Sequence, residues 1–243
     1  MFKLLRAAFR HYRQIAVVGA LLFASALCVA LVGARVAYTR NFYYIYFVWN
    51  LFLAWLPMLC ALTAYNLAKA RSRLSWLMMA GCAFVWLLFF PNAPYLLTDI
   101  LHLAPRPDIP LWYDLILVIA FAMSGTLLGL VSLYLMQLLV HRAAGPLLGW
   151  LFALGVLALS GFGIWLGRFQ RWNSWDLFTN PVALLSDIAY TLRHPLANWR
   201  TFAFSALFSL VFLSAYLTFA ALAYGQWDRP AARLPEPDGP FLP

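Results

Sequence analysis

Six long stretches with almost no charged side chain constrain this chain more than any other feature of its sequence. Each is long enough to cross the hydrocarbon core of a bilayer, which is about 30 Å thick and takes about 20 helical residues. Helices are the expected spanning structure, because lipid offers the backbone no hydrogen bonds. The spans are predicted near residues 15–34, 42–64, 74–91, 114–140, 146–167 and 201–224.

The composition agrees with a chain whose solvent is lipid. Of the 243 residues, 65% are hydrophobic and only 10% are charged, whereas soluble domains carry about 25% charged residues. The predicted fold class is all-α: an integral membrane bundle of six transmembrane helices over 1–224, with two short interfacial helices on the outer side. Residues 225–243 are rich in proline and are predicted to form a disordered cytoplasmic tail.

The basic residues predict the orientation. Lys3, Arg6, Arg10 and Arg13 precede the first span, whose uncharged stretch is longer than the apolar region of a signal peptide. With the N-terminus inside, the inner segments hold ten Lys and Arg residues and the outer loops seven. Both termini are therefore predicted to be cytoplasmic. The net charge of +9 does not indicate nucleic-acid binding, because the basic residues lie between apolar stretches.

The first outer segment with a polar character follows the third span. Two prolines in 91–94 interrupt the helix, because each removes a backbone donor. Beyond them, Tyr95, Asp99 and His102 share one face of a short helix. This helix is predicted to lie in the outer interface or to form a re-entrant piece.

The second outer segment runs over residues 168–200. Asn180 and Pro181 predict the start of a second interfacial helix, with Asn180 as its cap, and His194 before Pro195 predicts its end. Asp114 begins the fourth span near the surface, where a carboxylate costs less than at the bilayer centre and needs no special explanation. Glycines spaced four apart, such as Gly125 and Gly129, favour close helix contacts.

Two motifs carry a resemblance to a known family. The first is PNAPYLLTDI over 91–100 with the later Trp112-Tyr113-Asp114, and the second is GIWLGRFQRWNSWD over 163–176. With these motifs the chain resembles the bacterial family of domain of unknown function 1361, which are multi-pass membrane proteins. The resemblance implies residence in the bacterial cytoplasmic (inner) membrane. It implies no reaction, ligand or catalytic residue.

The six spans place both motifs on the same side of the membrane, and this predicts a polar and aromatic site on the outer face. The catalytic candidates are Asp99, Asp176 and Arg171. The binding candidates are Asn92, His102, Asp114, Arg168, Asn173, Trp172 and Trp175, with Asp187 and His194 as further members.

Three interpretations of these residues stay open. The aspartates could serve as acid and base beside a lipid-linked substrate, whose phosphate the arginines would hold. Asp99 and His102 could contribute to a metal site, although no metal-binding signature accompanies them. Alternatively, Arg168 or Arg171 pairs with Asp176 and only holds the loop.

The function is therefore left among three classes: an interfacial enzyme, a transporter or channel for a small solute, and a membrane assembly subunit. The cofactor is unknown, and the one certain partner is the lipid bilayer, with a lipid or a membrane protein as a further candidate. Proton-coupled transporters place ionisable groups at depth. No Asp, Glu, Lys or Arg is expected inside these spans, which disfavours transport.

Overall fold

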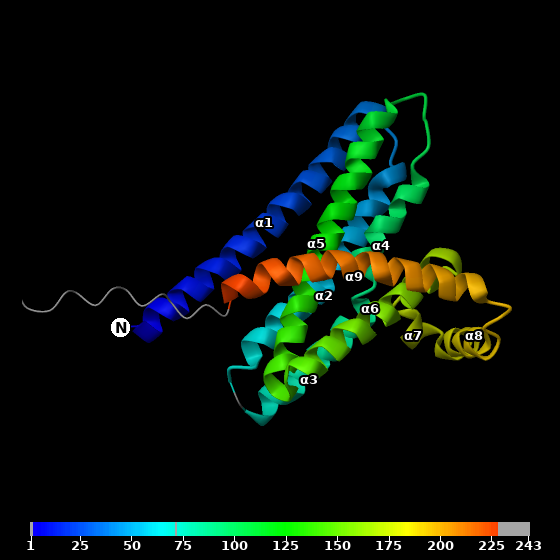
Figure 1. Cartoon of the computed structure of the whole chain (residues 1–243). Coiled ribbons are helices and arrows are strands. Elements are labelled where there is room, and N and C mark those ends of the chain that lie inside the picture. Colours follow the sequence, from blue (N-terminus) through cyan, green and yellow to red (C-terminus); the bar gives the residue numbers. More distant parts are fainter. Residues whose placement is uncertain (1, 71, 228–243) are drawn as a thin grey trace, which may run out of the picture.

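The computed structural model describes residues 2–70 and 72–227, which form an all-α bundle (Figure 1). Six of its helical segments are long and apolar enough to cross a membrane, which confirms the predicted class. The elements in order are α1 (Phe2–Thr39), η1 (Tyr43–Ile45), α2 (Tyr46–Leu67), α3 (Arg73–Phe89), α4 (Asn92–Tyr95), η2 (Leu96–His102), α5 (Leu111–Ala144), α6 (Pro146–Phe169), α7 (Asp176–Thr179), α8 (Pro181–Arg193) and α9 (Trp199–Trp227).

Helix α5 is the centre of the bundle. It packs against α1, α2, α6 and α9, and also against the α4–η2 segment. Figure 1 shows α1, α2 and α5 running together while α6 and α9 cross them. Residues 225–227 of the predicted tail belong to α9, and residues 228–243 lie outside the described part of the chain.

Consecutive spans alternate in direction and so divide the connections between two sides. The connections that follow the first, third and fifth spans are called the loop face below and are residues 40–45, 103–110 and 170–198. In Figure 1 the first two lie near the top of the bundle, and the third lies lower, beyond the end of α6. In Figure 1 the start of α1 and the described end of α9 both lie at the left of the molecule. The two motifs of the sequence therefore meet at the loop face, at the end of the third span and the end of α6.

The third span bends where the prolines predicted an interruption. Helix α3 ends at Phe89, and the Asn92 side chain donates a hydrogen bond to the Phe89 carbonyl at 3.0 Å. This bond satisfies a carbonyl at the end of α3. The chain then continues through α4 into the 3-10 helix η2, so the predicted short helical segment exists but is not one regular α-helix.

The polar side of this segment faces the bundle and not the aqueous phase. Asp99 is fully buried, whereas Ile100 and Leu101 are 50% and 63% exposed. The segment is thus a kinked continuation of the third span. Gly125 of α5 permits this packing, because a β-carbon there would lie 2.4 Å from the Ala93 carbonyl oxygen. The predicted close contact at this glycine is confirmed.

The second predicted short helix is α8, which lies across the loop face beyond the end of α6 (Figure 1). Pro181 occupies its first turn as expected. Asn180 stands at the cap position but makes no side-chain capping hydrogen bond, so that detail of the prediction is wrong. Leu184 and Thr191, seven residues apart, form its buried side.

Candidate functional site

Arg168, in the last turn of α6, is the centre of the polar contacts made by η2. Its Nη2 donates to the Asp99 carboxylate at 2.5 Å and to the Thr98 hydroxyl at 2.6 Å, and its Nε donates to the same hydroxyl at 2.9 Å. Its Nη1 lies 2.6 Å from His102 Nε2. A guanidinium only donates, so the His102 nitrogen accepts and the imidazole is neutral. These four side chains are called the Arg168 cluster below.

The 3-10 geometry of η2 explains why these residues face one arginine. Residues three apart eclipse one another in such a helix, which places Asp99 and His102 on one line. Asn50 of α2 approaches the second Asp99 oxygen at 3.4 Å. A buried carboxylate requires such partners, because an unpaired charge away from water is costly. The cluster therefore joins α6 to η2 and α2.

A second buried ion pair lies elsewhere on the loop face. Arg35 of α1 donates two hydrogen bonds to Asp114 of α5, from Nε to Oδ1 at 2.7 Å and from Nη2 to Oδ2 at 3.2 Å. Both side chains are at most 2% exposed. The expectation that Asp114 needs no special explanation is therefore wrong, because this carboxylate is buried and paired. The expectation of spans free of Asp, Glu, Lys and Arg is wrong as well, because Arg35 and Asp114 lie inside α1 and α5.

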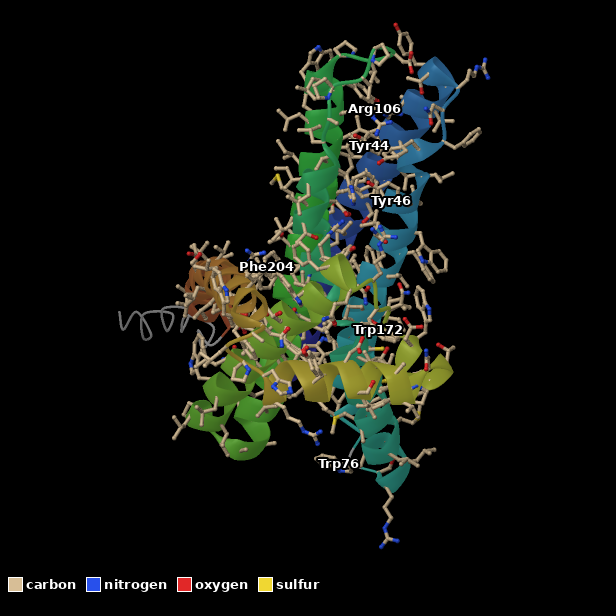
Figure 2. The ribbon with its side chains drawn as sticks, turned by 90° about the vertical axis from the view of Figure 1, so that its right-hand side faces the viewer. Tyr44, Tyr46, Trp76, Arg106, Trp172 and Phe204 are labelled. Carbon is tan, nitrogen blue, oxygen red and sulfur yellow. The ribbon has the colours of Figure 1, made fainter. Side chains whose placement is uncertain are left out.

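Arg35 is the functional candidate that sequence reasoning missed. The Tyr44 ring lies 4.3 Å from its guanidinium, and Arg106 packs over the neighbouring Tyr43 ring at 3.8 Å. Figure 2 shows Tyr44 and Arg106 together, well separated from Trp172 in the 170–175 loop. Arg35 continues the buried stripe of α1, which also contains Leu21, Ser25, Cys28 and Val32. This spacing of three and four residues is a helical pattern in the sequence, and it predicts that Arg35 lies on the buried face of α1.

The loop after α6 is held by its own short-range contacts. Arg171 is exposed and has a φ of 64°, a left-handed conformation that helps to end the helix. The Asp176 carboxylate accepts from the Asn173 backbone N–H at 2.7 Å and from the Thr179 hydroxyl at 3.0 Å. The Asn173 amide, followed by this hydroxyl, holds the pKa of the Asp176 carboxyl below its ordinary value. The described residues contain no ion pair between Arg171 and Asp176.

Two further hydrogen bonds attach this loop to the bend of the third span. Asn92 donates to the Ser174 hydroxyl at 3.0 Å, and Ser174 donates to the Leu88 carbonyl at 3.0 Å. Gly163 allows Pro91 to lie against α6, since a β-carbon there would be 3.1 Å from the Pro91 ring. The two motifs are thus in direct contact.

A pocket of about 300 Å³ lies between the two motifs. Its walls are the start of α2, the bend after α3, the end of α6, the 170–175 loop, and α7 and α8. The polar lining residues are Asn50, Asn92, Asn173 and Ser174, and the aromatic ones are Trp49, Tyr95, Trp172 and Trp175. The Trp172 indole is fixed by donating to Asp187 at 3.0 Å. No Asp, Glu, Lys, Arg or His is among the described residues that line the pocket.

The predicted site residues therefore fall into five places. Asp99, His102 and Arg168 meet in the cluster, and Asn92, Trp172, Asn173 and Trp175 line the pocket. Asp114 belongs to the pair with Arg35, while Arg171 and Asp176 lie in the loop. His194 packs against the Tyr190 ring at the end of α8, with ring centres 4.8 Å apart. Trp49 and Ser174 were not predicted, and Tyr95 was noted only for its helix face.

In the described part of the chain, no three His, Cys, Asp or Glu side chains are placed to hold a metal ion. No curated protein and no solved structure matches the chain. A family described as a protein of unknown function, DUF1361, matches residues 49–215. This range contains both motifs, the Arg168 cluster and the pocket. The match confirms the resemblance drawn from the two motifs, and the chain is a member of the DUF1361 family of proteins of unknown function.

Proposed function

We propose that this membrane protein binds a small amphipathic molecule, such as a lipid headgroup with the first part of its chains, in the pocket at the loop face. The observation that carries the proposal is the composition of the pocket. Apolar residues such as Leu53, Leu184 and Ile188 share its lining with three carboxamides and four aromatic rings. Small-molecule sites combine a largely apolar wall with a few polar groups in this way.

Binding is favoured over acid–base catalysis because the candidate acids do not line the pocket. Asp99 is buried behind Asn50 and paired with Arg168, and Asp176 is bound within its own turn. A general acid or base must lie within hydrogen-bond reach of the proton that it transfers. Arg168 uses four of its five N–H groups in the Arg168 cluster and does not line the pocket, which disfavours a role in holding a phosphate there.

The loop face is proposed to be the outer side of the bacterial cytoplasmic membrane, with both termini in the cytoplasm. The basic residues before the first span support this orientation. It is tested with cysteines introduced at exposed positions of a variant without native cysteines. A membrane-impermeant maleimide added to intact cells should label Asn173→Cys and not Asn66→Cys. The reverse labelling would invert the orientation.

Ligand binding is tested by native mass spectrometry of the protein extracted with its bound lipids. Trp49→Ala removes an aromatic wall of the pocket. Trp112→Ala is the matched control, because Trp112 is a similarly exposed indole on the loop face outside the pocket. Trp49→Ala should lose a bound species that the wild type and Trp112→Ala retain. Identical spectra for the three proteins would reject the proposal.

A further inference from the structure

From the charges around the pocket, we infer that its ligand is a lipid whose headgroup is uncharged and carries several hydroxyl groups, as a glycosyl headgroup does. This inference rests on the proposed function and adds the chemical class of the ligand. It depends on three observations: the absence of charge from the described lining, the state of the nearest charges, and the hydrogen-bonding groups that the lining leaves available.

The charged side chains that contact lining residues are already bonded within the protein. Asp176 and Asp187 accept hydrogen bonds from Asn173 and Trp172 at exposed positions. Asp99 and Arg168 form an ion pair 2.5 Å apart, and neither lines the pocket. An anionic headgroup would therefore enter without a counter-charge, and burying an unpaired charge is strongly unfavourable.

A cationic headgroup is disfavoured for a different reason. Aromatic rings attract cations, and four of them line this pocket. However, the Arg168 guanidinium already lies 4.3 Å from the centre of the Tyr95 ring. The face of the Tyr95 ring is therefore already occupied by a cation, and the Asp99 carboxylate beside it is bound to the same arginine.

The hydrogen-bonding groups that the pocket lining leaves free match the hydroxyl groups of a ligand. Both N–H groups of the Asn92 carboxamide have protein acceptors, Phe89 O and Ser174 Oγ, which leaves its carbonyl oxygen to accept. The Asn50 and Asn173 carboxamides each donate one N–H to a carboxylate, that of Asp99 and that of Asp176, and each keeps its other N–H and its carbonyl oxygen. A hydroxyl donates and accepts at once, so several hydroxyls can bond to three carboxamides. The flat apolar face of a sugar ring can pack on an indole such as that of Trp175.

The test uses the full chain in detergent micelles, given an equimolar mixture of three lipids with identical acyl chains. The lipids are a glucosyl diacylglycerol, a phosphatidic acid and a phosphatidylcholine, and native mass spectrometry measures which is retained. We expect the wild type to retain the glucosyl lipid in preference. Trp175→Ala and Asn173→Leu should each reduce this preference about three- to tenfold, the effect of one aromatic contact or one hydrogen bond. Trp112→Ala should leave it unchanged.

Two other results would each overturn the inference. If phosphatidic acid or phosphatidylcholine is preferred and Trp175→Ala abolishes that preference, the pocket binds lipid but the inference of an uncharged headgroup is wrong. If neither variant changes the retention of any lipid, the proposed function fails together with the inference. Asn173→Leu keeps the test decisive if Trp175→Ala does not fold. Asn173 is exposed. The substitution removes its side-chain bond to Asp176 at 3.3 Å, but the backbone bond to the same carboxylate at 2.7 Å does not depend on the side chain.

Discussion

Replacement of Arg168 by leucine is expected to destabilise the protein by about 3–4 kcal/mol at pH 7. The wild-type guanidinium makes four hydrogen bonds, to Asp99, Thr98 and His102. Without it, the fully buried Asp99 carboxylate keeps only the distant Asn50 amide at 3.4 Å. Removing one partner of a buried ion pair costs about 3–5 kcal/mol, because the other charge stays buried and unpaired.

Proton uptake limits this loss and gives it a pH dependence. Protonating an ordinary aspartate costs about 4 kcal/mol at pH 7 and about 1.5 kcal/mol at pH 5. In Arg168→Leu the Asp99 carboxylate can take up a proton at that cost, and it then carries no unpaired charge. The loss of stability should therefore fall from about 3–4 kcal/mol at pH 7 to about 1.5 kcal/mol at pH 5.

The assay is the free energy of unfolding in mixed detergent micelles, measured at pH 5, 6 and 7. Arg193→Leu is the control, because this exposed arginine in the last turn of α8 should change stability by less than about 0.5 kcal/mol. A His102→Gln background removes imidazole titration from the comparison. Arg168→Leu with Asp99→Leu should recover much of the loss. A loss below about 1 kcal/mol at pH 7, or an equal loss at pH 5, would refute the electrostatic explanation.

Three further predictions follow from contacts elsewhere in the chain. Asp114→Leu should lower the free energy of unfolding by about 3–5 kcal/mol, equally at pH 5 and pH 7, because the buried Arg35 left behind cannot lose its proton. A smaller loss of stability at one of the two pH values would contradict this. Gly125→Ala should cost about 1–3 kcal/mol of stability in the same assay, because the added β-carbon meets a backbone oxygen. Gly155→Ala is the control and should not destabilise the protein, because nothing lies within 4 Å of an added β-carbon there. Equal effects of the two substitutions would contradict the packing at Gly125. The depressed pKa of Asp176 contributes stability that is fully present above the ordinary pKa of an aspartate and is lost as the pH falls through the lowered value. The difference in thermal midpoint between wild type and Asp176→Asn should therefore shrink on acidification below about pH 4, and a constant difference would argue against it.

The sequence predicted the neighbourhood of the candidate site better than its internal contacts. The span count placed both motifs on one side, and their contact through Asn92 and Ser174 agrees with that. It did not predict that Arg168, rather than Arg171, would meet Asp99. The choice depends on the bend at Pro91 and on the 3-10 geometry of η2, which direct Asp99 into the bundle. The left-handed φ of Arg171 also belongs to the folded loop and has no sequence signal here, because glycine is the usual residue there.

By itself, the sequence determined the six spans, the break in the third span and the helix that begins at Pro181. Each of these follows from local chemistry: the length of an apolar stretch, the missing N–H of proline, or the preference of proline for a first helical turn. The tertiary structure decided which charges pair. Arg35 and Asp114 are 79 residues apart in the chain and meet only because α1 packs against α5. It also decided that the described residues lining the pocket carry no charge, because Asp99 and Arg168 are bound to each other outside it.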